Sequence, residues 1–273
     1  MTVFQSILLG IIQGLTEFLP VSSSGHLVLI PYLLNWDIPA QQAFVFDVLV
    51  QVATLVGVFA YFWKDLTGIV RSFLSGLLKG RPFEDSQSRL GWLLLLATIP
   101  AGLFGLLVKD AVESAFSSPV LTAVFLLVTA VLLFLAERIG RKTRTLEELN
   151  WKDALWMGIF QALAIFPGIS RSGATITGGM TRNLLRPSAA RFSFLMSIPI
   201  MLAAGLLASL DLLELSNLGS ILPVMIPGFL AAAVTGYLAI RWLLTYLVSR
   251  SLNIFAAYCA VIGLVILGLE FLL

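Results

Sequence analysis

Long apolar runs alternate with short polar segments along the whole chain. Six of these runs approach the roughly 20 residues that an α-helix needs to cross the hydrocarbon core of a bilayer. They cover residues 43–63, 90–108, 119–137, 191–213, 222–243 and 254–273. The pattern therefore predicts six transmembrane helices.

Two further apolar stretches, residues 2–34 and 154–185, are interrupted by Pro, Gly and clusters of small hydroxyl residues. Each half is too short to span a bilayer, so we expect two re-entrant helical hairpins that enter the membrane and turn back within it. Irregular backbone at membrane depth is tolerated only where protein buries it or where it lines a cavity. The two breaks are therefore the places to look for function.

Composition supports a membrane protein and excludes several soluble classes. Of 273 residues, 12% are charged and 59% are hydrophobic, whereas about a quarter of the residues in a soluble domain are charged. We therefore exclude a soluble enzyme, a disordered chain and a nucleic-acid binder. The single cysteine, Cys259, excludes an internal disulfide and a Cys-based metal site. The first residues carry no basic segment, so we expect no cleaved signal peptide.

Basic residues predict the orientation of the spans. Fifteen of the 17 Lys and Arg residues fall in segments that the six spans leave on one side of the membrane, and Lys109 and Arg171 are the exceptions. Because cytoplasmic loops carry an excess of Lys and Arg, we expect those segments in the cytoplasm and both chain ends outside. The first hairpin then enters from outside and the second from the cytoplasm.

An internal repeat supports this arrangement. Shifting the chain by 148 residues aligns residues 10–26 (GIIQGLTEFLPVSSSGH) with residues 158–174 (GIFQALAIFPGISRSGA), and eight of the 17 positions are identical. Each copy then holds one hairpin and three spans, and an odd number of spans inverts the second copy. We predict a single integral membrane domain over residues 1–273, with repeat 1 at about 2–137 and repeat 2 at about 154–273. Inverted repeats with broken helices place a ligand site near the midplane.

The two copies differ at the positions that carry chemistry. The alignment pairs Glu17 with Ile165, Ser23 with Arg171, and His26 with Ala174. Ionisable groups inside a membrane are costly and usually functional. We therefore expect one asymmetric site with a carboxylate and an imidazole from the first hairpin and a guanidinium from the second.

Arg171 lies in PGISRSG, a turn followed by a helix, which offers backbone N–H groups and a positive dipole end to an anion. Its guanidinium matches a phosphate bidentately, and Ser170, Ser172 and Thr175 supply further donors. The alternative is a structural Arg that caps a helix or pairs with an acid. Glu17, one helical turn after Gln13, could hold a cation, orient His26, or only pair with Arg171.

His26 follows Ser22, Ser23 and Ser24 and could act as acid, base or nucleophile in phosphoryl transfer. The alternative for a lone histidine is a satisfied core residue. Each of the three serines could be a nucleophile, a phosphate donor or a helix cap, and Ser23 is favoured as nucleophile because it aligns with Arg171.

Asp47, one helical turn before Gln51, could extend the polar site, or could only face water. A single carboxylate is a weak metal signal because hard cations take several oxygen ligands.

The segments QGLTEFLPVSSSGH (13–26) and PGISRSGAT (167–175) closely resemble the two signature segments of the bacterial undecaprenyl-diphosphatase family, the bacitracin-resistance proteins BacA/UppP. The chain length, six spans and two hairpins resemble that family too, so the resemblance covers the whole chain.

The resemblance implies hydrolysis of undecaprenyl diphosphate to undecaprenyl phosphate and inorganic phosphate. It implies a role in peptidoglycan synthesis, bacitracin resistance, an inner-membrane location and a site reached from the periplasm. It also implies dependence on a divalent cation, Mg²⁺ or Ca²⁺. By motif, the catalytic set is Glu17, Ser23, His26 and Arg171, and the substrate-binding set is Gln13, Ser22, Ser24, Ser170, Ser172 and Thr175. The family has Glu or Gln where this chain has Gln13, which makes Asp47 a candidate second metal ligand beside Glu17.

Two other functional classes stay open at this point. A secondary transporter or lipid flippase would also have inverted repeats and broken helices. A scaffold protein would not need buried Glu, His and Arg at the breaks. The expected partners are a polyprenyl diphosphate and membrane lipid, and a homodimer stays open because glycine-rich helix faces pack within or between protomers.

Overall fold

The structure, a computed structural model, describes residues 1–116, 118–213 and 218–272. Every regular element within these ranges is a helix, and one isolated parallel bridge joins Arg144 to Leu184. The helices in chain order are α1 (Val3–Phe18), α2 (Ser23–Leu33), α3 (Ala40–Tyr61), α4 (Trp63–Leu78), α5 (Ser86–Leu107), α6 (Lys109–Phe116), α7 (Pro119–Ile139), α8 (Trp151–Leu163), α9 (Arg171–Thr181), α10 (Arg186–Leu213), α11 (Leu218–Tyr246) and α12 (Asn253–Leu272).

Six helices in the described part of the chain are long and apolar enough to cross a membrane: α3, α5, α7, α10, α11 and α12. Each of them contains one of the six predicted spans almost entirely. Helices α5 and α10 begin a few residues before the apolar runs do, because polar residues such as Ser86 and Arg186 fill their first turns. The prediction of an all-α, multi-pass membrane protein is confirmed.

Helix α4 was not predicted, because its segment was interpreted as a cytoplasmic loop. Its apolar residues recur at helical spacing: Ile69 is buried against the core, whereas Val70, Leu74 and Leu77 are exposed. An amphipathic helix with an exposed apolar stripe is typical of a membrane surface. The rule that found the spans looked for continuous apolar runs and therefore missed an amphipathic helix. The short helix α6 was missed for the same reason.

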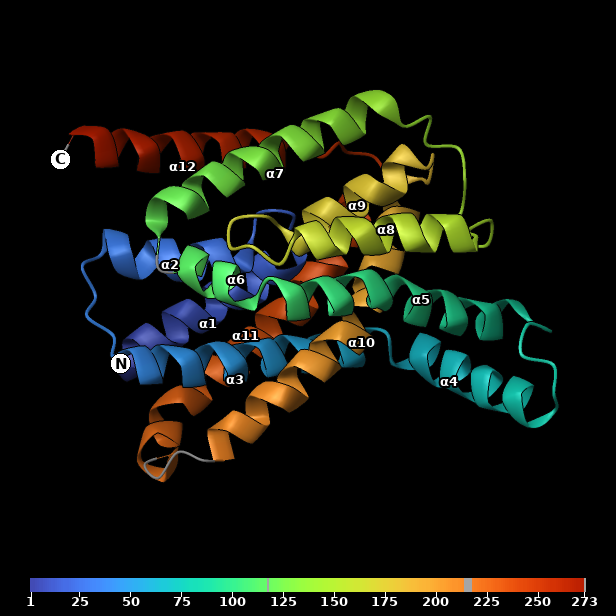
Figure 1. Ribbon diagram of the computed structural model, residues 1–273, viewed down its shortest axis with the longest axis horizontal. Coiled ribbons are helices and arrows are strands. Elements are labelled where there is room, and N and C mark those ends of the chain that lie inside the picture. Colours follow the sequence, from blue (N-terminus) through green and yellow to red (C-terminus); the bar gives the residue numbers. More distant parts are fainter. Residues whose placement is uncertain (117, 214–217, 273) are drawn as a thin grey trace.

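The two predicted hairpins appear as two pairs of short helices, α1 with α2 and α8 with α9. Their lengths of 16, 11, 13 and 11 residues are all below what a span needs. In Figure 1, α1 and α2 lie toward the side that holds both chain ends, and α8 and α9 toward the opposite side. The turns of the two pairs contact each other. That the pairs enter a membrane from opposite faces stays a prediction.

Glycines let the short helices approach the long ones closely. A Cβ on Gly10 of α1 would lie 2.2 Å from the carbonyl oxygen of Gly228 in α11. A Cβ on Gly158 of α8 would lie 2.4 Å from the carbonyl oxygen of Ala97 in α5. Small residues at such crossings allow backbones to pack in contact, as in other membrane helix pairs. Gly10 and Gly158 are 148 residues apart, so this packing repeats with the spacing of the sequence repeat.

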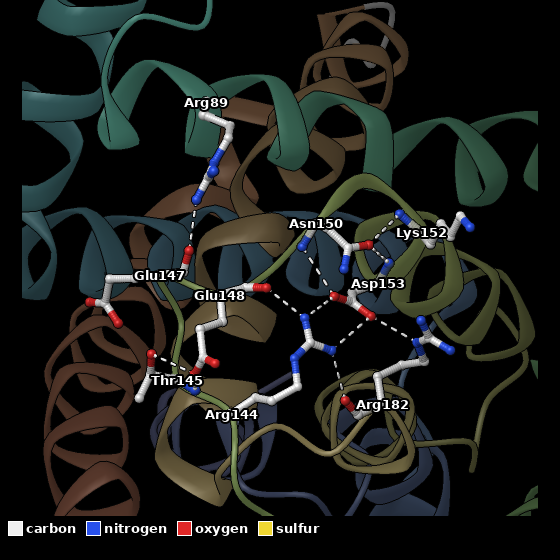
Figure 2. Close-up of polar contacts among 9 residues, drawn as sticks. All are labelled: Arg89, Arg144, Thr145, Glu147, Glu148, Asn150, Lys152, Asp153 and Arg182. Atoms are coloured by element: carbon white, nitrogen blue, oxygen red, sulfur yellow. Dashed lines mark hydrogen bonds and ion pairs between the residues drawn. The ribbon is translucent and has the colours of Figure 1, made fainter.

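Ion pairs hold together the end of the molecule that carries most basic residues. Asp153, fully buried at the start of α8, accepts hydrogen bonds from Arg144 and from Arg182 at the end of α9 (Figure 2). Burial opposes ionisation of Asp153, but these bonds hold its pKa below the ordinary value. Glu137 at the end of α7 accepts in the same way from Lys142 and Arg186. Several basic residues that indicate orientation therefore also join the helix ends.

Candidate active site

The turns of the two short helix pairs are built by the same hydrogen bonds. Ser22 caps α2 by accepting from the N–H of Gly25 at 3.2 Å, and Ser170 caps α9 by accepting from the N–H of Gly173 at 3.1 Å. The Ser22 and Ser24 hydroxyl oxygens lie 3.3 Å apart, and the Ser170 and Ser172 hydroxyl oxygens lie 3.1 Å apart. Serine at a helix N-cap satisfies a free backbone N–H, so Ser22 and Ser170 serve the fold.

The two turns are joined directly. Gly168 donates its N–H to the Ser22 hydroxyl at 3.1 Å, and the Ser172 hydroxyl donates to the carbonyl of Leu19 at 3.1 Å. Gly168 has a φ of +96°, and a Cβ there would lie 2.2 Å from the carbonyl oxygen of Thr122. Only glycine fits this backbone position without strain. The PGIS sequence therefore sets the second turn against the first.

Glu17 lies at the centre of the polar contacts between the two pairs. One carboxylate oxygen accepts from the Arg171 guanidinium at 2.6 Å, and the other accepts from the Ser23 hydroxyl at 2.5 Å and from the Gln13 amide at 3.0 Å. The Glu17 side chain is 9% exposed and that of Arg171 is 17% exposed. Residues from both halves of the chain thus form one partly buried site.

A cavity of about 300 Å³ opens beside this cluster. Its polar wall contains Glu17, Ser23 and Arg171, and its apolar wall comes from α6, α10 and the end of the α8–α9 pair. It is lined by Glu17, Ser22, Ser23, Ser24, Gln51, Phe116, Ala164, Ile165, Ile169, Ser170, Arg171, Ile200, Met201 and Ala204. A cavity with one charged wall and one apolar wall fits an amphipathic ligand with an anionic end.

Not every predicted substrate-binding residue faces this cavity. Ser22, Ser24 and Ser170 line it, whereas Gln13, Ser172 and Thr175 do not. The Thr175 hydroxyl donates to the backbone carbonyl of Arg171 at 2.8 Å and lies 2.6 Å from the Ser193 hydroxyl. Ser172 and Thr175 therefore use their hydroxyls in bonds within the protein.

His26 lies on the same helix as Ser23 but faces elsewhere. Its Nδ1 is 2.7 Å from the Ser22 carbonyl oxygen, and its Nε2 is 2.7 Å from the hydroxyl of Tyr258 in α12. His26 does not line the cavity, and the group that contacts the Ser23 hydroxyl is Glu17. Sequence reasoning did not find Tyr258, because a single tyrosine in an apolar span carries no distinguishing pattern.

The polar atoms around Glu17 offer oxygen ligands for a hard cation. The Oε1 atom of Gln13 is buried and has no hydrogen-bond partner among the described residues. Asp47 does not line the cavity, and no group of three or more His, Cys, Asp and Glu residues forms in the described ranges. A cation here would take Glu17, Gln13 and serine oxygens, and would need water or ligand oxygens to complete its shell.

A second and larger cavity, of about 620 Å³, lies at the basic end of the molecule. It shares no lining residue with the first, and its charges include the Arg191–Asp65 ion pair. Arg89 also lines it and donates to the backbone carbonyl of Glu147 at 2.7 Å (Figure 2). We assign the candidate active site to the smaller cavity, because Glu17 there contacts both the Ser23 hydroxyl and the Arg171 guanidinium, which come from the turns of the two short helix pairs.

Comparison with known proteins covers both halves of this site. The model of the family described as bacitracin resistance protein BacA matches residues 6–265, which include both turns and the cavity. The chain belongs to the BacA family. Its relatives in this family include a Thermomicrobium roseum protein that is 44% identical over 98% of both chains. A Chlorobium phaeovibrioides protein is 43% identical over 98% of this chain and 96% of its own, and a Methanosphaera stadtmanae protein is 40% identical over 99% of both. All three carry the name undecaprenyl-diphosphatase.

The match to the BacA family covers nearly the whole fold, residues 6–265, and is not limited to one motif. The segments that carried the resemblance, residues 13–26 and 167–175, supply the two turns and the Glu17, Ser23 and Arg171 contacts. In this BacA-family chain the signature segments are therefore the parts that build the polar wall of the cavity.

Proposed function

We propose that this chain hydrolyses undecaprenyl diphosphate to undecaprenyl phosphate and inorganic phosphate. The observation that carries the proposal is the contact of Glu17 with both Ser23 and Arg171 at a cavity that also has an apolar wall. The reaction would return the lipid carrier to peptidoglycan synthesis. It would also confer bacitracin resistance by removing the diphosphate lipid to which the antibiotic binds.

Arg171 is the residue we assign to the diphosphate. One of its terminal nitrogens is bonded to Glu17, which leaves further N–H donors of the guanidinium for phosphate oxygens. Arg171 is also the first residue of α9, so free N–H groups and the positive end of the helix dipole lie beside it. These groups stabilise the charge that moves to the leaving oxygen in phosphoryl transfer.

Ser23 is the nucleophile that the contacts favour. Its Oγ would attack the terminal phosphorus, its proton would pass to the Glu17 carboxylate, and the bond from phosphorus to the bridging oxygen would break. Undecaprenyl phosphate leaves at this step, and water then hydrolyses the phosphoserine to release inorganic phosphate. Glu17 takes the role of base because its carboxylate already accepts a hydrogen bond from the Ser23 hydroxyl, with the two oxygens 2.5 Å apart. The ring nitrogens of His26 contact Ser22 and Tyr258 instead of Ser23.

Trapping separates this route from direct attack by water. After a short incubation with substrate labelled in the terminal phosphate and an acid quench, we expect the label on Ser23. A burst of free phosphate with no labelled protein would assign the attack to water with Glu17 as base. Label on His26 would contradict both assignments.

A divalent cation, Mg²⁺ or Ca²⁺, belongs to the proposed function as well. Glu17 lines the cavity, and the Oε1 atom of Gln13, whose amide is bonded to Glu17, has no hydrogen-bond partner in the part of the chain that the structure describes. Both are oxygens of the type these ions prefer. When bound, the ion would neutralise charge on the diphosphate oxygens. Asp47 stays a prediction as a metal ligand, since it does not line the cavity. A chelator should abolish phosphate release, and added Mg²⁺ or Ca²⁺ should restore it.

We also propose that the protein resides in the bacterial inner membrane with its site reached from the periplasm. Phe116 of α6 lines the cavity, and α6 follows the end of α5 that the basic-residue rule places outside. A membrane-impermeant thiol reagent added outside intact cells should label Phe116→Cys in a Cys259→Ala background. Labelling only after the inner membrane is opened would reverse the orientation. A homodimer stays a prediction.

The decisive test uses purified protein in detergent. It should release inorganic phosphate from a prenyl diphosphate, and Glu17→Ala, Ser23→Ala and Arg171→Ala should each reduce the release by at least about 100-fold, the scale of a lost catalytic group. A protein that only moves lipid across a membrane would release no phosphate. That outcome would favour the transporter alternative.

A further inference from the structure

Both ring nitrogens of His26, the only histidine in the chain, are engaged. Nδ1 lies 2.7 Å from the Ser22 carbonyl oxygen, and Nε2 lies 2.7 Å from the hydroxyl of Tyr258, a residue 232 positions further along the chain. The His26 and Tyr258 rings are within 6° of parallel. His26 is therefore held by its own helix on one side and by α12 on the other.

The Ser22 carbonyl determines which nitrogen of His26 carries the proton. A neutral imidazole has one N–H and one lone pair, and a carbonyl oxygen only accepts. The proton is therefore on Nδ1, and Nε2 accepts from the Tyr258 hydroxyl. Because the partner of one ring nitrogen fixes the state of the other, Tyr258 stabilises the one tautomer that can bond to Ser22.

Ser22 is the strained point of the first turn. Its φ is +68°, a left-handed conformation that strains a residue with a side chain. The surrounding contacts hold it there: its hydroxyl accepts from Gly25 and Gly168, and its carbonyl faces the His26 ring. The next residue is Ser23, so a displaced Ser22 carbonyl would move Ser23 away from Glu17.

We propose that Tyr258 is a positioning residue: through His26 it fixes the Ser22 turn and so holds the Ser23 hydroxyl against Glu17. Tyr258 does not line the cavity, and it is not one of the residues that donate hydrogen bonds to Glu17. It also lies outside both signature segments of the sequence. The kinetic consequence of this role rests on the function proposed above, whereas its consequence for the His26 tautomer does not.

Nuclear magnetic resonance of protein labelled with ¹⁵N-histidine tests the tautomer directly, because His26 gives the only histidine signals. In the intact protein in detergent, at a pH where the ring is neutral, we expect the proton on Nδ1 and a hydrogen-bonded Nε2. In Tyr258→Phe the Nε2 signal should shift toward that of a free lone pair. A proton on Nε2 in the wild type, or an Nε2 signal unchanged by the substitution, would overturn the proposal.

Phosphate release then tests positioning, with Tyr32→Phe as the matched control. Tyr32 also joins α2 to α12, through a 2.6 Å hydrogen bond from its hydroxyl to Glu270, and it does not contact His26. Tyr258→Phe should lower kcat about two- to tenfold, the range that one hydrogen bond accounts for. KM should change by less than about twofold, because Tyr258 does not line the cavity.

The control separates positioning from simple tethering of the two helices. Tyr32→Phe should leave both kcat and the His26 signals unchanged. An equal loss of kcat in the two variants would overturn the positioning role. Absence of phosphate release from the wild-type protein would instead overturn the proposed function, and the tautomer measurement would still stand.

Discussion

Replacing Glu17 by Gln separates the charge and basicity of this residue from its size. The carboxylate accepts three hydrogen bonds, from Arg171, Ser23 and Gln13. An amide of the same shape has one accepting oxygen, so its NH₂ group must face either Arg171 or the Ser23 and Gln13 donors. In the first orientation two donor groups meet, and in the second the Ser23 hydroxyl loses the acceptor for its proton.

Two effects of Glu17→Gln can be estimated from these contacts. A lost general base lowers the rate by about 10²–10⁴, which corresponds to roughly 2.7–5.4 kcal/mol in the barrier. Loss of the charge partner of Arg171 should lower the free energy of unfolding by about 1–3 kcal/mol, since Arg171 keeps some access to water. We expect kcat to fall at least about 100-fold, and the released Arg171 guanidinium remains available to phosphate.

The assay is phosphate release from a prenyl diphosphate at saturating substrate, with thermal unfolding in the same detergent to correct for the folded fraction. Glu84→Gln is the matched control, because Glu84 also pairs with an arginine but is exposed and lies at the basic end. A corrected kcat for Glu17→Gln within about threefold of wild type would refute the role of Glu17 as proton acceptor. A large rise in KM with normal kcat would refute it as well.

Three further substitutions test the clamp, the ion cluster and the packing. Arg171→Lys should lower kcat/KM by about 10–100-fold because the forked donor geometry is lost, whereas Arg241→Lys on α11 should not change it. Asp153→Asn should lower the free energy of unfolding by about 2 kcal/mol, less than a fully buried pair because its arginines are partly exposed. Since the pKa of Asp153 is lowered in the folded state, this difference should be present near neutral pH, begin to shrink as the pH falls through about 4, and disappear only below the lowered folded-state pKa in thermal unfolding. Gly158→Ala should lower stability by about 1–3 kcal/mol, because the added Cβ meets the backbone of α5. Gly102→Ala, with nothing within 4 Å of the added Cβ, should not lower it.

The sequence predicted the spans well because the bilayer imposes a length and an apolar composition on each of them. It did not predict α4, because charged residues such as Lys64, Asp65 and Arg71 interrupt its apolar positions and leave no continuous run. The short helix pairs could be predicted from broken apolar stretches. Their direct contact through Gly168 and Ser22 depends on backbone geometry that a single sequence does not reveal.

The candidate site was predictable to the extent that the two copies of the repeat differ. Positions that stayed alike, such as Ser22 and Ser170, form equivalent caps and build equivalent turns. The charged residues Glu17 and Arg171 occur in one copy each, and the structure brings them together at 2.6 Å. A symmetric pair of turns therefore provides the frame, and unlike residues placed on it provide the chemistry.

The same comparison explains why His26 was harder to place. Its repeat partner is Ala174, so the sequence marks His26 as unusual but says nothing about the direction of its ring. That direction depends on Tyr258, which comes from α12 and has no place in either turn. The role of His26 therefore depends on Tyr258, a residue that the sequence does not mark as unusual, and on which nitrogen of His26 the Tyr258 hydroxyl contacts. Because the Tyr258 hydroxyl occupies Nε2 and the Ser22 carbonyl occupies Nδ1, His26 has no free nitrogen for Ser23, and this leaves Glu17 as the base in contact with it.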